Sequence, residues 1–347
     1  MTRLGRRANP GRMQPLAPPR PIPADTAILI LGAPRSGTTW LGKIFDSHPD
    51  VLYRHEPDQY SEAAADLPAA ALRAAVTRWI HERAPRSAAK RPFFRKSWQS
   101  DPAFGLRHAI AAALALGAKL PWVGNAVVRW AVPDLAAIDR APGLRAVLKS
   151  VAWCHGAGAF ARALPDSRIV LILRHPCGQI ASVMRGNAQR RFDLRAADTD
   201  MPYDEALAIA CAAKHGIGEP AFQALVPAAR YAWGWVAFNE AAMDSLQGLR
   251  NARTVVYETL CADPAAEARA LLEFAGLTWH AQTAAFIARS TRDGASTGYY
   301  AVFRDSVAAA NAWRSGMSAA DQDAVRSVVR LSPLARHWPD LAWPDLA

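Results

Sequence analysis

Short apolar runs alternate with longer alanine-rich stretches along this chain of 347 residues. Four runs are short and buried in character, and we expect them to form strands at 27–31, 146–151, 168–173 and 254–257. Helical patterns separate these runs, which is the arrangement of parallel βα units. The sequence therefore predicts an α/β fold in three layers, with a central parallel sheet flanked by helices.

Two of the predicted helices have clear boundaries. The first follows a loop at 32–39, presents one apolar face and ends before Pro49. The second begins at Asp263 and Pro264 and stops at Gly276, with proline in the first turn and glycine just past the end. Both helices follow predicted strands, as the βα pattern requires.

The chain divides into one large domain and two short tails. Residues 1–25 are basic and proline-rich without an apolar signal segment, so we expect an unstructured tail. Residues 26–335 form the predicted domain, with a helical, irregular insertion at about 61–144. Residues 336–347 form a second tail that contains the sequence Trp-Pro-Asp-Leu-Ala twice, a repeat too short for a solenoid unit.

The net charge of +11 favours anionic ligands without naming one. The amino-terminal tail holds five basic residues and one acidic residue, which leaves +7 on the rest of the chain. Zinc-finger spacing, an RNP-like strand and long basic runs are missing, so we expect no nucleic-acid partner. The longest apolar run, 109–118, is shorter than the ~20 residues that span a bilayer.

The four cysteines are far apart and form no C-x-x-C motif. This spacing suggests neither a disulfide framework nor a zinc site, and it fits a reducing cytoplasm best. No set of histidines and carboxylates has usable ligand spacing, so we expect no metal.

The loop Gly32-Ala33-Pro34-Arg35-Ser36-Gly37-Thr38-Thr39 follows a predicted buried strand and opens a helix. Backbone N–H groups and the helix dipole converge at such a turn and form an anion seat. The spacing is that of a P-loop, but Thr38 stands where the phosphate-binding lysine belongs. Because this cationic clamp is missing, the loop argues against a kinase or ATPase and favours a smaller, less charged anion.

The segment Pro34-Arg35-Ser36-Gly37-Thr38-Thr39-Trp40-Leu41 resembles the 5′-phosphosulfate loop of sulfotransferases that use 3′-phosphoadenosine 5′-phosphosulfate (PAPS) as co-substrate. The resemblance implies a P-loop-like fold in which Arg35 and the loop hydroxyls and amides hold the 5′-phosphate and the sulfuryl group. The residues that it assigns to co-substrate binding are Arg35, Ser36, Gly37, Thr38, Thr39 and Trp40.

A second segment, 168–176 followed by Ser182, is similar to the strand, Arg-Asp-Pro and helix element of the same family. The resemblance implies that Arg174 and Ser182 bind the 3′-phosphate. An arginine at the end of a strand can bind a phosphate with two hydrogen bonds, and a serine in the next helix can donate to the same oxygens. His175 stands in place of the aspartate, so Arg174 lacks the carboxylate that would orient it.

Two further segments resemble the family. Residues 255–277 are similar to its Tyr-Glu-Asp-Leu, Asp-Pro and Phe-Leu-Gly-Leu sequence, which implies that Tyr257 helps to recognise adenine. Tyr257 could equally be a core residue whose hydroxyl is satisfied. Residues 303–314 look like the late segment of carbohydrate-type members, which implies that Arg304 closes over the nucleotide.

Sulfuryl transfer needs a group that deprotonates the acceptor hydroxyl. Glu56, followed by Pro57, is similar to the glutamate that carbohydrate and tyrosylprotein sulfotransferases use as this base. We expect Glu56 just beyond a strand next to the phosphosulfate loop, where partial burial could raise its pKa. The alternative is a structural glutamate that pairs with Arg54 or Arg35.

Histidine is the rival base. Cytosolic members place one shortly after a lysine on a central strand, but here His155 follows Lys149 at a longer spacing. The adjacent His55 should point away from Glu56 if the segment is extended. Lys149 itself is a candidate to touch the sulfuryl or bridging oxygen, or else a lysine that extends from the strand end into solvent.

The leading hypothesis is a PAPS-dependent O-sulfotransferase with a small-molecule, carbohydrate or glycolipid acceptor. One alternative is a nucleotide kinase that requires Mg²⁺ and ATP. Another is a non-catalytic protein that binds anions or a membrane surface, suggested by the basic tail and the patch Phe93-Phe94-Arg95-Lys96-Ser97-Trp98. The same patch would suit a cytoplasmic enzyme that contacts a membrane to reach a lipid acceptor.

Overall fold

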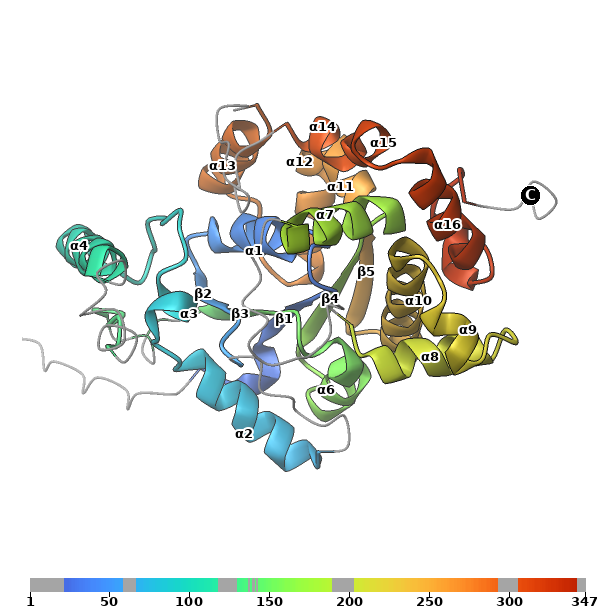
Figure 1. Ribbon diagram of the computed structural model, residues 1–347. Coiled ribbons are helices and arrows are strands. Elements are labelled where there is room, and N and C mark those ends of the chain that lie inside the picture. The colour runs from blue at the N-terminus through green and yellow to red at the C-terminus, as the bar shows by residue number, and fades with distance from the viewer. Residues whose placement is uncertain are drawn as a thin grey trace, which may run out of the picture.

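A five-stranded parallel sheet forms the centre of the protein (Figure 1). The computed structural model describes residues 22–58, 67–117, 130–136, 138, 141, 143–188, 203–292 and 305–341. The sheet order is β2-β3-β1-β4-β5, and every pairing is parallel. The strands are β1 Ile28–Leu31, β2 Val51–His55, β3 Arg145–Ser150, β4 Arg168–Leu173 and β5 Ala252–Val256. The predicted α/β architecture is confirmed.

Two hydrophobic clusters pack on opposite faces of the sheet because side chains alternate along each strand. On β1, Leu29 and Leu31 belong to one cluster, and Ile28 and Ile30 belong to the other. This burial on both faces explains why the strand is apolar throughout.

The cluster that contains Leu29 is covered by helices from across the chain: α2 Ala69–Ile80, α6 Ala157–Ala163, α7 Pro176–Ala188, α8 Glu205–Ala213, α9 Glu219–Gln223, α10 Pro227–Leu246, α15 Trp313–Gly316 and α16 Ala319–Val329. The cluster that contains Ile28 is covered by α1 Thr38–Asp46, α11 Tyr257–Ala262, α12 Pro264–Phe274, α13 Ala281–Arg292 and α14 Ser306–Asn311. The two sets of helices and the sheet form three layers (Figure 1).

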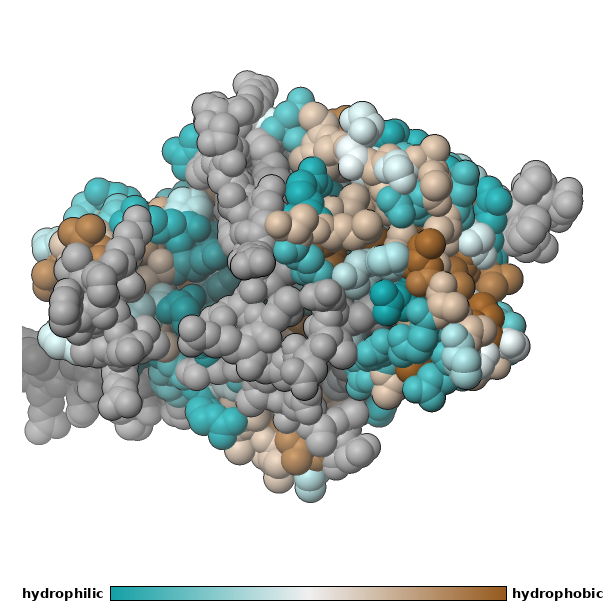
Figure 2. All heavy atoms as spheres, viewed as in Figure 1, coloured by the Kyte–Doolittle hydropathy of each residue, from teal (hydrophilic) through white to brown (hydrophobic). Residues whose placement is uncertain are grey.

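The remaining helices are short or peripheral: α3 Pro85–Ala88, α4 Asp101–Gly117 and the 3-10 helices η1 Ala24–Thr26, η3 Cys154–Gly156 and η4 Pro333–His337. Figure 2 shows hydrophobic residues at the surface over α4, where Leu106 and Leu116 are 55% and 67% exposed. Within the described ranges, no helix has the length and apolarity needed to cross a membrane.

Strand β2 is the element that the hydrophobic pattern did not single out. Its last three residues are Tyr53, Arg54 and His55, yet all of them are buried. Arg54 is buried because its guanidinium pairs with Asp134 at 2.8 Å. Glu56 does follow a strand as expected, but β3 lies between that strand and β1, so β2 is not the direct neighbour of the strand that precedes the loop at 32–37.

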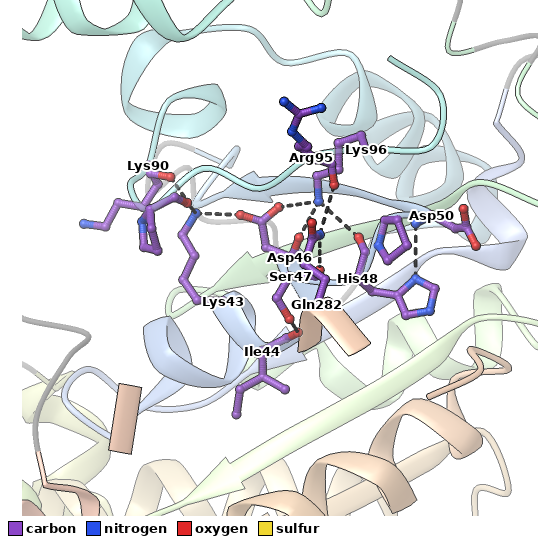
Figure 3. Close-up of polar contacts among 12 residues, drawn as sticks. Lys43, Ile44, Asp46, Ser47, His48, Asp50, Lys90, Arg95, Lys96 and Gln282 are labelled. Atoms are coloured by element: carbon purple, nitrogen blue, oxygen red, sulfur yellow. Dashed lines mark hydrogen bonds and ion pairs between the residues drawn. The ribbon is translucent and has the colours of Figure 1, made fainter. Parts of the chain in front are cut away.

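A buried ionic cluster ties residues 90–96 to α1 (Figure 3). Lys43 Nζ lies 2.6 Å from Asp46 Oδ2 and donates to the backbone carbonyls of Lys90 and Pro92. Lys96 Nζ lies 2.9 Å from Asp46 Oδ1. This segment is therefore held against α1, the helix that follows β1.

The patch at 93–98 does not form the continuous aromatic and basic surface that the sequence suggested. Phe94 is buried, with its ring 5.1 Å from that of Phe286, and the side chain of Lys96 is 9% exposed and forms an ion pair with Asp46. These two side chains face the interior because Phe94 packs on Phe286 and Lys96 pairs with Asp46.

Candidate active site

The loop after β1 turns sharply before α1 begins at Thr38. Arg35 and Gly37 have φ values of 71° and 102°, both in the left-handed region. Gly37 is required for a second reason, since a Cβ atom there would lie 2.5 Å from Cδ2 of Tyr257. The loop is fixed by Ser36 N, which donates to Ala33 O at 3.1 Å, and by Gln179 Nε2, which donates to Pro34 O at 2.8 Å.

This loop has the features of an anion site. The first N–H groups of α1 have no acceptor within the helix, and the helix dipole adds partial positive charge at this end. Ser36 is fully buried, and its hydroxyl has no hydrogen-bond partner among the described residues. Thr38 and Thr39 open the helix beside it. A 5′-phosphosulfate group would satisfy these donors.

Arg35, Ser182 and Arg174 meet at the carboxyl ends of β1 and β4, which are neighbours in the sheet. Arg35 Nε donates to Ser182 Oγ at 3.1 Å, and Arg174 Nη1 donates to the backbone carbonyl of Arg35 at 3.0 Å. The sequence suggested Ser182 as the companion of Arg174, whereas its hydroxyl accepts a hydrogen bond from Arg35. The two predicted basic groups therefore form one contiguous site.

Arg174 is oriented without the aspartate that His175 replaces. Its guanidinium carbon lies 4.7 Å from the centre of the Tyr257 ring, a cation–π contact, and Nη2 donates to Ala309 O at 3.2 Å. Its Nε is buried without a partner among the described residues. An aromatic face and two carbonyls thus hold the guanidinium, which keeps further N–H groups, among them the one on Nε, for a ligand.

Tyr257 and Trp40 lie beneath this site. Tyr257 is buried, and its ring makes an edge contact with that of Trp40 at 6.2 Å. Trp40 Nε1 donates to Ser290 Oγ of α13 at 3.1 Å. This placement corresponds to the core alternative for Tyr257, with the ring supporting Gly37 and Arg174 from below.

Glu56 and Lys149 form an ion pair at the carboxyl ends of β2 and β3. Lys149 faces His55 in the register of these strands and is only 2% exposed, so the alternative of a lysine extending into solvent is wrong. Arg54 pairs with Asp134 instead of Glu56, which removes one of the two structural partners considered for the glutamate. Glu56 has a left-handed φ of 46°, which directs the chain out of the strand.

His55 lies beside Glu56, and the prediction that it points elsewhere is wrong. His55 Nε2 is 3.8 Å from Glu56 Oε2, and its Nδ1 is 3.0 Å from the Tyr53 hydroxyl. The expectation assumed an extended chain, but Glu56 leaves that conformation. Burial, and after it the charges of Lys149, Lys90 and Lys43, hold the pKa of His55 well below its usual value, so the ring is neutral at pH 7.

Two residues near this pair carried no signal in the sequence. Burial lowers the pKa of Lys90, Glu56 opposes this effect, and the charges of Lys149 and Arg35 add to it. Lys90 therefore shares the electrostatic field of the site. Asp58 accepts a hydrogen bond from Ser150, and burial raises the pKa of this carboxyl group. Lys90 and Asp58 come close to the Glu56–Lys149 pair only through tertiary packing, so no local sequence motif predicts their positions.

Arg304 lies outside the described residues, and so does the side chain of His155. Among the histidine, cysteine, aspartate and glutamate side chains that the structure describes, no group of three or more is placed to hold a metal ion.

The arrangement combines two chemical parts on one edge of the sheet. Arg35, Arg174 and the start of α1 supply cationic groups and N–H donors for anions. Lys149, on the neighbouring strand β3, supplies an ammonium, and Glu56, which follows β2 one strand further out, supplies a carboxylate. Such a site can bind a negatively charged substrate that donates a chemical group, and it can accept a proton from a second substrate.

Solved sulfotransferase structures share low sequence identity with this chain. The sulfotransferase domain from the Synechococcus PCC 7002 olefin synthase is 16% identical, with 92% of this chain and 98% of that chain covered and a TM-score of 0.42. Mouse sulfotransferase SULT7A1, complexed with PAP, is 14% identical, with 92% and 89% covered and a TM-score of 0.45. Sulfotransferase STF9 from Mycobacterium avium is 14% identical, with 93% and 78% covered and a TM-score of 0.40. Likenesses this weak carry no argument by themselves.

Sequence comparison gives a more definite result. No curated protein sequence matches the chain. The profile of the family described as "Sulfotransferase family" matches residues 27–281, which is well over half of the chain and includes both parts of the site. The chain belongs to the sulfotransferase family.

Proposed function

We propose that this protein transfers a sulfuryl group from PAPS to a hydroxyl group of a carbohydrate or glycolipid acceptor. One observation carries the proposal: Arg35, Arg174 and Ser182 lie together at the carboxyl ends of β1 and β4, and the Glu56–Lys149 pair lies on the same edge of the sheet. The first group suits a doubly phosphorylated nucleotide, and the second suits a hydroxyl acceptor.

The nucleotide would be held at both of its phosphate groups. The Ser36 hydroxyl, the side chains of Thr38 and Thr39 and the N–H groups that open α1 are the donors for the 5′-phosphosulfate. Arg174 and Ser182 are the donors for the 3′-phosphate, with Arg35 between the two groups. The unsatisfied Ser36 Oγ and Arg174 Nε fit this role, because a buried donor is costly unless a ligand pairs with it.

Glu56 is the proposed base. The acceptor hydroxyl oxygen attacks sulfur, its bond to sulfur forms, and its proton passes to the Glu56 carboxylate. The bond between sulfur and the bridging phosphate oxygen breaks, and adenosine 3′,5′-bisphosphate (PAP) leaves with that electron pair. Lys149, whose ammonium pairs with the Glu56 carboxylate, is the residue that we propose to offset charge on the leaving oxygen.

The acceptor class rests on the resemblance of Glu56 and of the late segment to carbohydrate-type members. The cysteines are all free thiols and buried, which supports a reducing compartment such as the cytoplasm. Phe94 is buried and the Lys96 side chain is 9% exposed, so the patch offers less aromatic and basic surface than its sequence suggests, and the proposal includes no membrane contact there.

A transfer assay tests the proposal. The full chain is incubated with radiolabelled PAPS and, in parallel, with saccharides, glycolipids and phenols, each with and without a metal chelator. We expect label to appear in a saccharide or glycolipid and the chelator to have no effect. Transfer of phosphate from ATP that requires Mg²⁺, or no transfer from PAPS to any acceptor, would contradict the proposal.

A further inference from the structure

Residues 338–341, the described part of the first copy of the repeated Trp-Pro-Asp-Leu-Ala sequence, pack into the body of the protein. Trp338 is 4% exposed, and its Nε1 donates to Glu258 Oε2 at 3.0 Å. Glu258 follows Tyr257 at the start of α11, directly below the nucleotide site. A segment near the end of the chain therefore reaches the element that supports Arg174.

The Glu258 carboxylate connects this segment to the turn after β4. Both of its oxygens accept from the backbone N–H of His175, at 3.1 and 3.2 Å. His175 lies between Arg174 and Pro176, the first residue of α7. The hydrogen bond from Trp338 orients the Glu258 carboxylate. This carboxylate in turn holds the backbone N–H of His175, the residue that follows Arg174.

The side chain of His175 is enclosed by the same segment. Its ring stacks on Trp313, with centres 4.4 Å apart and planes at 12°, and makes an edge contact with Trp338 at 5.6 Å. Its Nε2 lies 3.4 Å from Asp340 Oδ2. Trp338 and Asp340 thus both lie next to the His175 ring, and Trp313 stacks on its face.

A second line of contacts leads from Trp338 to the phosphosulfate loop. The rings of Trp338 and Trp235 are 5.8 Å apart, and Trp235 Nε1 donates to Gln179 Oε1 at 3.0 Å. Gln179 in turn donates to Pro34 O in the loop. This connection is longer and passes through α7, so its effect on the loop is expected to be weaker than the effect on Arg174.

We propose that Trp338 and Asp340 are positioning residues for the 3′-phosphate site. An arginine binds phosphate with two hydrogen bonds only when its planar guanidinium is held in the correct orientation. The turn that carries Arg174 has no carboxylate of its own, and Glu258 and Asp340 supply carboxylates from other elements. The inference rests on the proposed function, because it assigns a role within the same nucleotide site.

The test compares two nucleotides that differ only in the 3′-phosphate. Calorimetric titration measures Kd for PAP and for adenosine 5′-phosphate with the wild type, Trp338→Phe and Asp340→Asn. Trp338→Phe keeps an aromatic ring but removes the N–H donor to Glu258. We expect Kd for PAP to rise about tenfold in Trp338→Phe and about threefold in Asp340→Asn, with Kd for adenosine 5′-phosphate within about twofold of wild type.

Matched controls are available in the same chain. Trp279→Phe changes a half-buried tryptophan that packs on Arg269, and Asp323→Asn changes an exposed aspartate on α16. Neither control should alter Kd for PAP by more than about twofold. Thermal unfolding of each variant shows whether it is folded; should Trp338→Phe fail to fold, Asp340→Asn, whose carboxylate is partly exposed, decides the matter.

Three outcomes separate the possibilities. Unchanged Kd for PAP in the variants would overturn the positioning role, and so would an equal loss of affinity for both nucleotides, which indicates general destabilisation. If the wild type binds PAP no more tightly than adenosine 5′-phosphate, the proposed function itself fails, because the 3′-phosphate is then not recognised.

Discussion

Glu56 adopts a strained backbone conformation at the position where the chemistry is proposed. A left-handed φ in a residue other than glycine costs on the order of 1 kcal/mol. The conformation brings the carboxylate onto Lys149 and within 3.8 Å of His55. The three side chains form a unit in which a neutral imidazole and an ammonium contact one carboxylate.

Glu56→Gln should lower kcat by about 10²–10⁴, because the amide cannot accept the hydroxyl proton. Kd for PAP should stay within about twofold, since the nucleotide donors are on other strands. Steady-state kinetics and titration measure the two quantities. Glu273→Gln, an exposed glutamate on α12, is the matched control and should have no effect.

His55→Asn distinguishes the two candidate bases. The neutral, enclosed ring contacts Glu56 at long range, so we expect its loss to lower kcat only about tenfold through positioning. A loss as large as that of Glu56→Gln, measured at the same pH, would assign the proton transfer to the histidine instead.

The resemblance to the family pointed to Arg35, Arg174 and Ser182 as site candidates because each lies in a short local motif, in the turn after a strand or in the helix that follows. It did not place His55 beside Glu56, since that contact depends on one left-handed residue. Nor did it identify Lys90, which reaches the site from a segment held by Lys43. Local patterns identify residues in turns between strands and helices, whereas these contacts arise from tertiary packing.

At the scale of elements, the turn between β1 and α1 depends on Gly37. Gly37→Ala should lower the free energy of unfolding by about 1–3 kcal/mol and raise Kd for PAP at least tenfold, because the added methyl group meets the Tyr257 ring in a left-handed backbone. Gly216→Ala is the control: φ there is +79° but the space is open. It should cost about 1 kcal/mol and leave Kd for PAP unchanged. Chemical denaturation and titration give both values; equal effects of the two variants would contradict this explanation.

The cluster that holds residues 90–96 on α1 predicts a pH dependence of stability. Burial lowers the pKa of Lys43 to about 8, although Asp46 opposes the shift. Between pH 8 and 10.5 the unfolded chain therefore binds more protons at this lysine than the native protein does. The contribution of this group to the free energy of unfolding rises with pH across that window and is flat below it.

Urea denaturation of the wild type and of Lys43→Met between pH 7 and 10 tests this contribution. The free energy of unfolding of the wild type minus that of the variant should increase by on the order of 2 kcal/mol from pH 7 to 10. Other titrating groups are common to both proteins and largely cancel in the difference. A difference that is constant or falls with pH would show that Lys43 keeps an ordinary pKa.

The predicted βα pattern succeeded where an element is apolar or has clear caps. Helix α12 begins at Pro264, where the Asp263 side chain accepts from Ala266 N, and it ends before Gly276 as the sequence indicated. Strand β2 was not singled out because buried Arg54 and His55 look polar in the sequence. Lys96 looked like surface for the same reason. A charged residue that is buried in an ion pair is not recognised as an interior position from the hydrophobic pattern of the sequence.

At the scale of the whole molecule, the proposed nucleotide site is assembled from distant parts of the chain. Arg35 and Arg174 are 139 residues apart and come together because β1 and β4 are neighbours in the sheet. Trp338 reaches Glu258 across 80 residues. The repeated sequence that contains Trp338 had no interpretation on its own, because its contacts are with residues far away in the chain. The positions of β1 and β4 follow from the fold class, whereas the docking of this segment does not.

A crystal structure of the protein with bound PAP tests the central claim most directly. We expect the 5′-phosphate at the N–H groups of residues 36–39 and the 3′-phosphate within hydrogen-bonding distance of Arg174 and Ser182. Glu56 should be on the open side of the 5′-phosphate, where an acceptor could approach. PAP bound elsewhere, or bound with its 3′-phosphate remote from Arg174, would contradict the account.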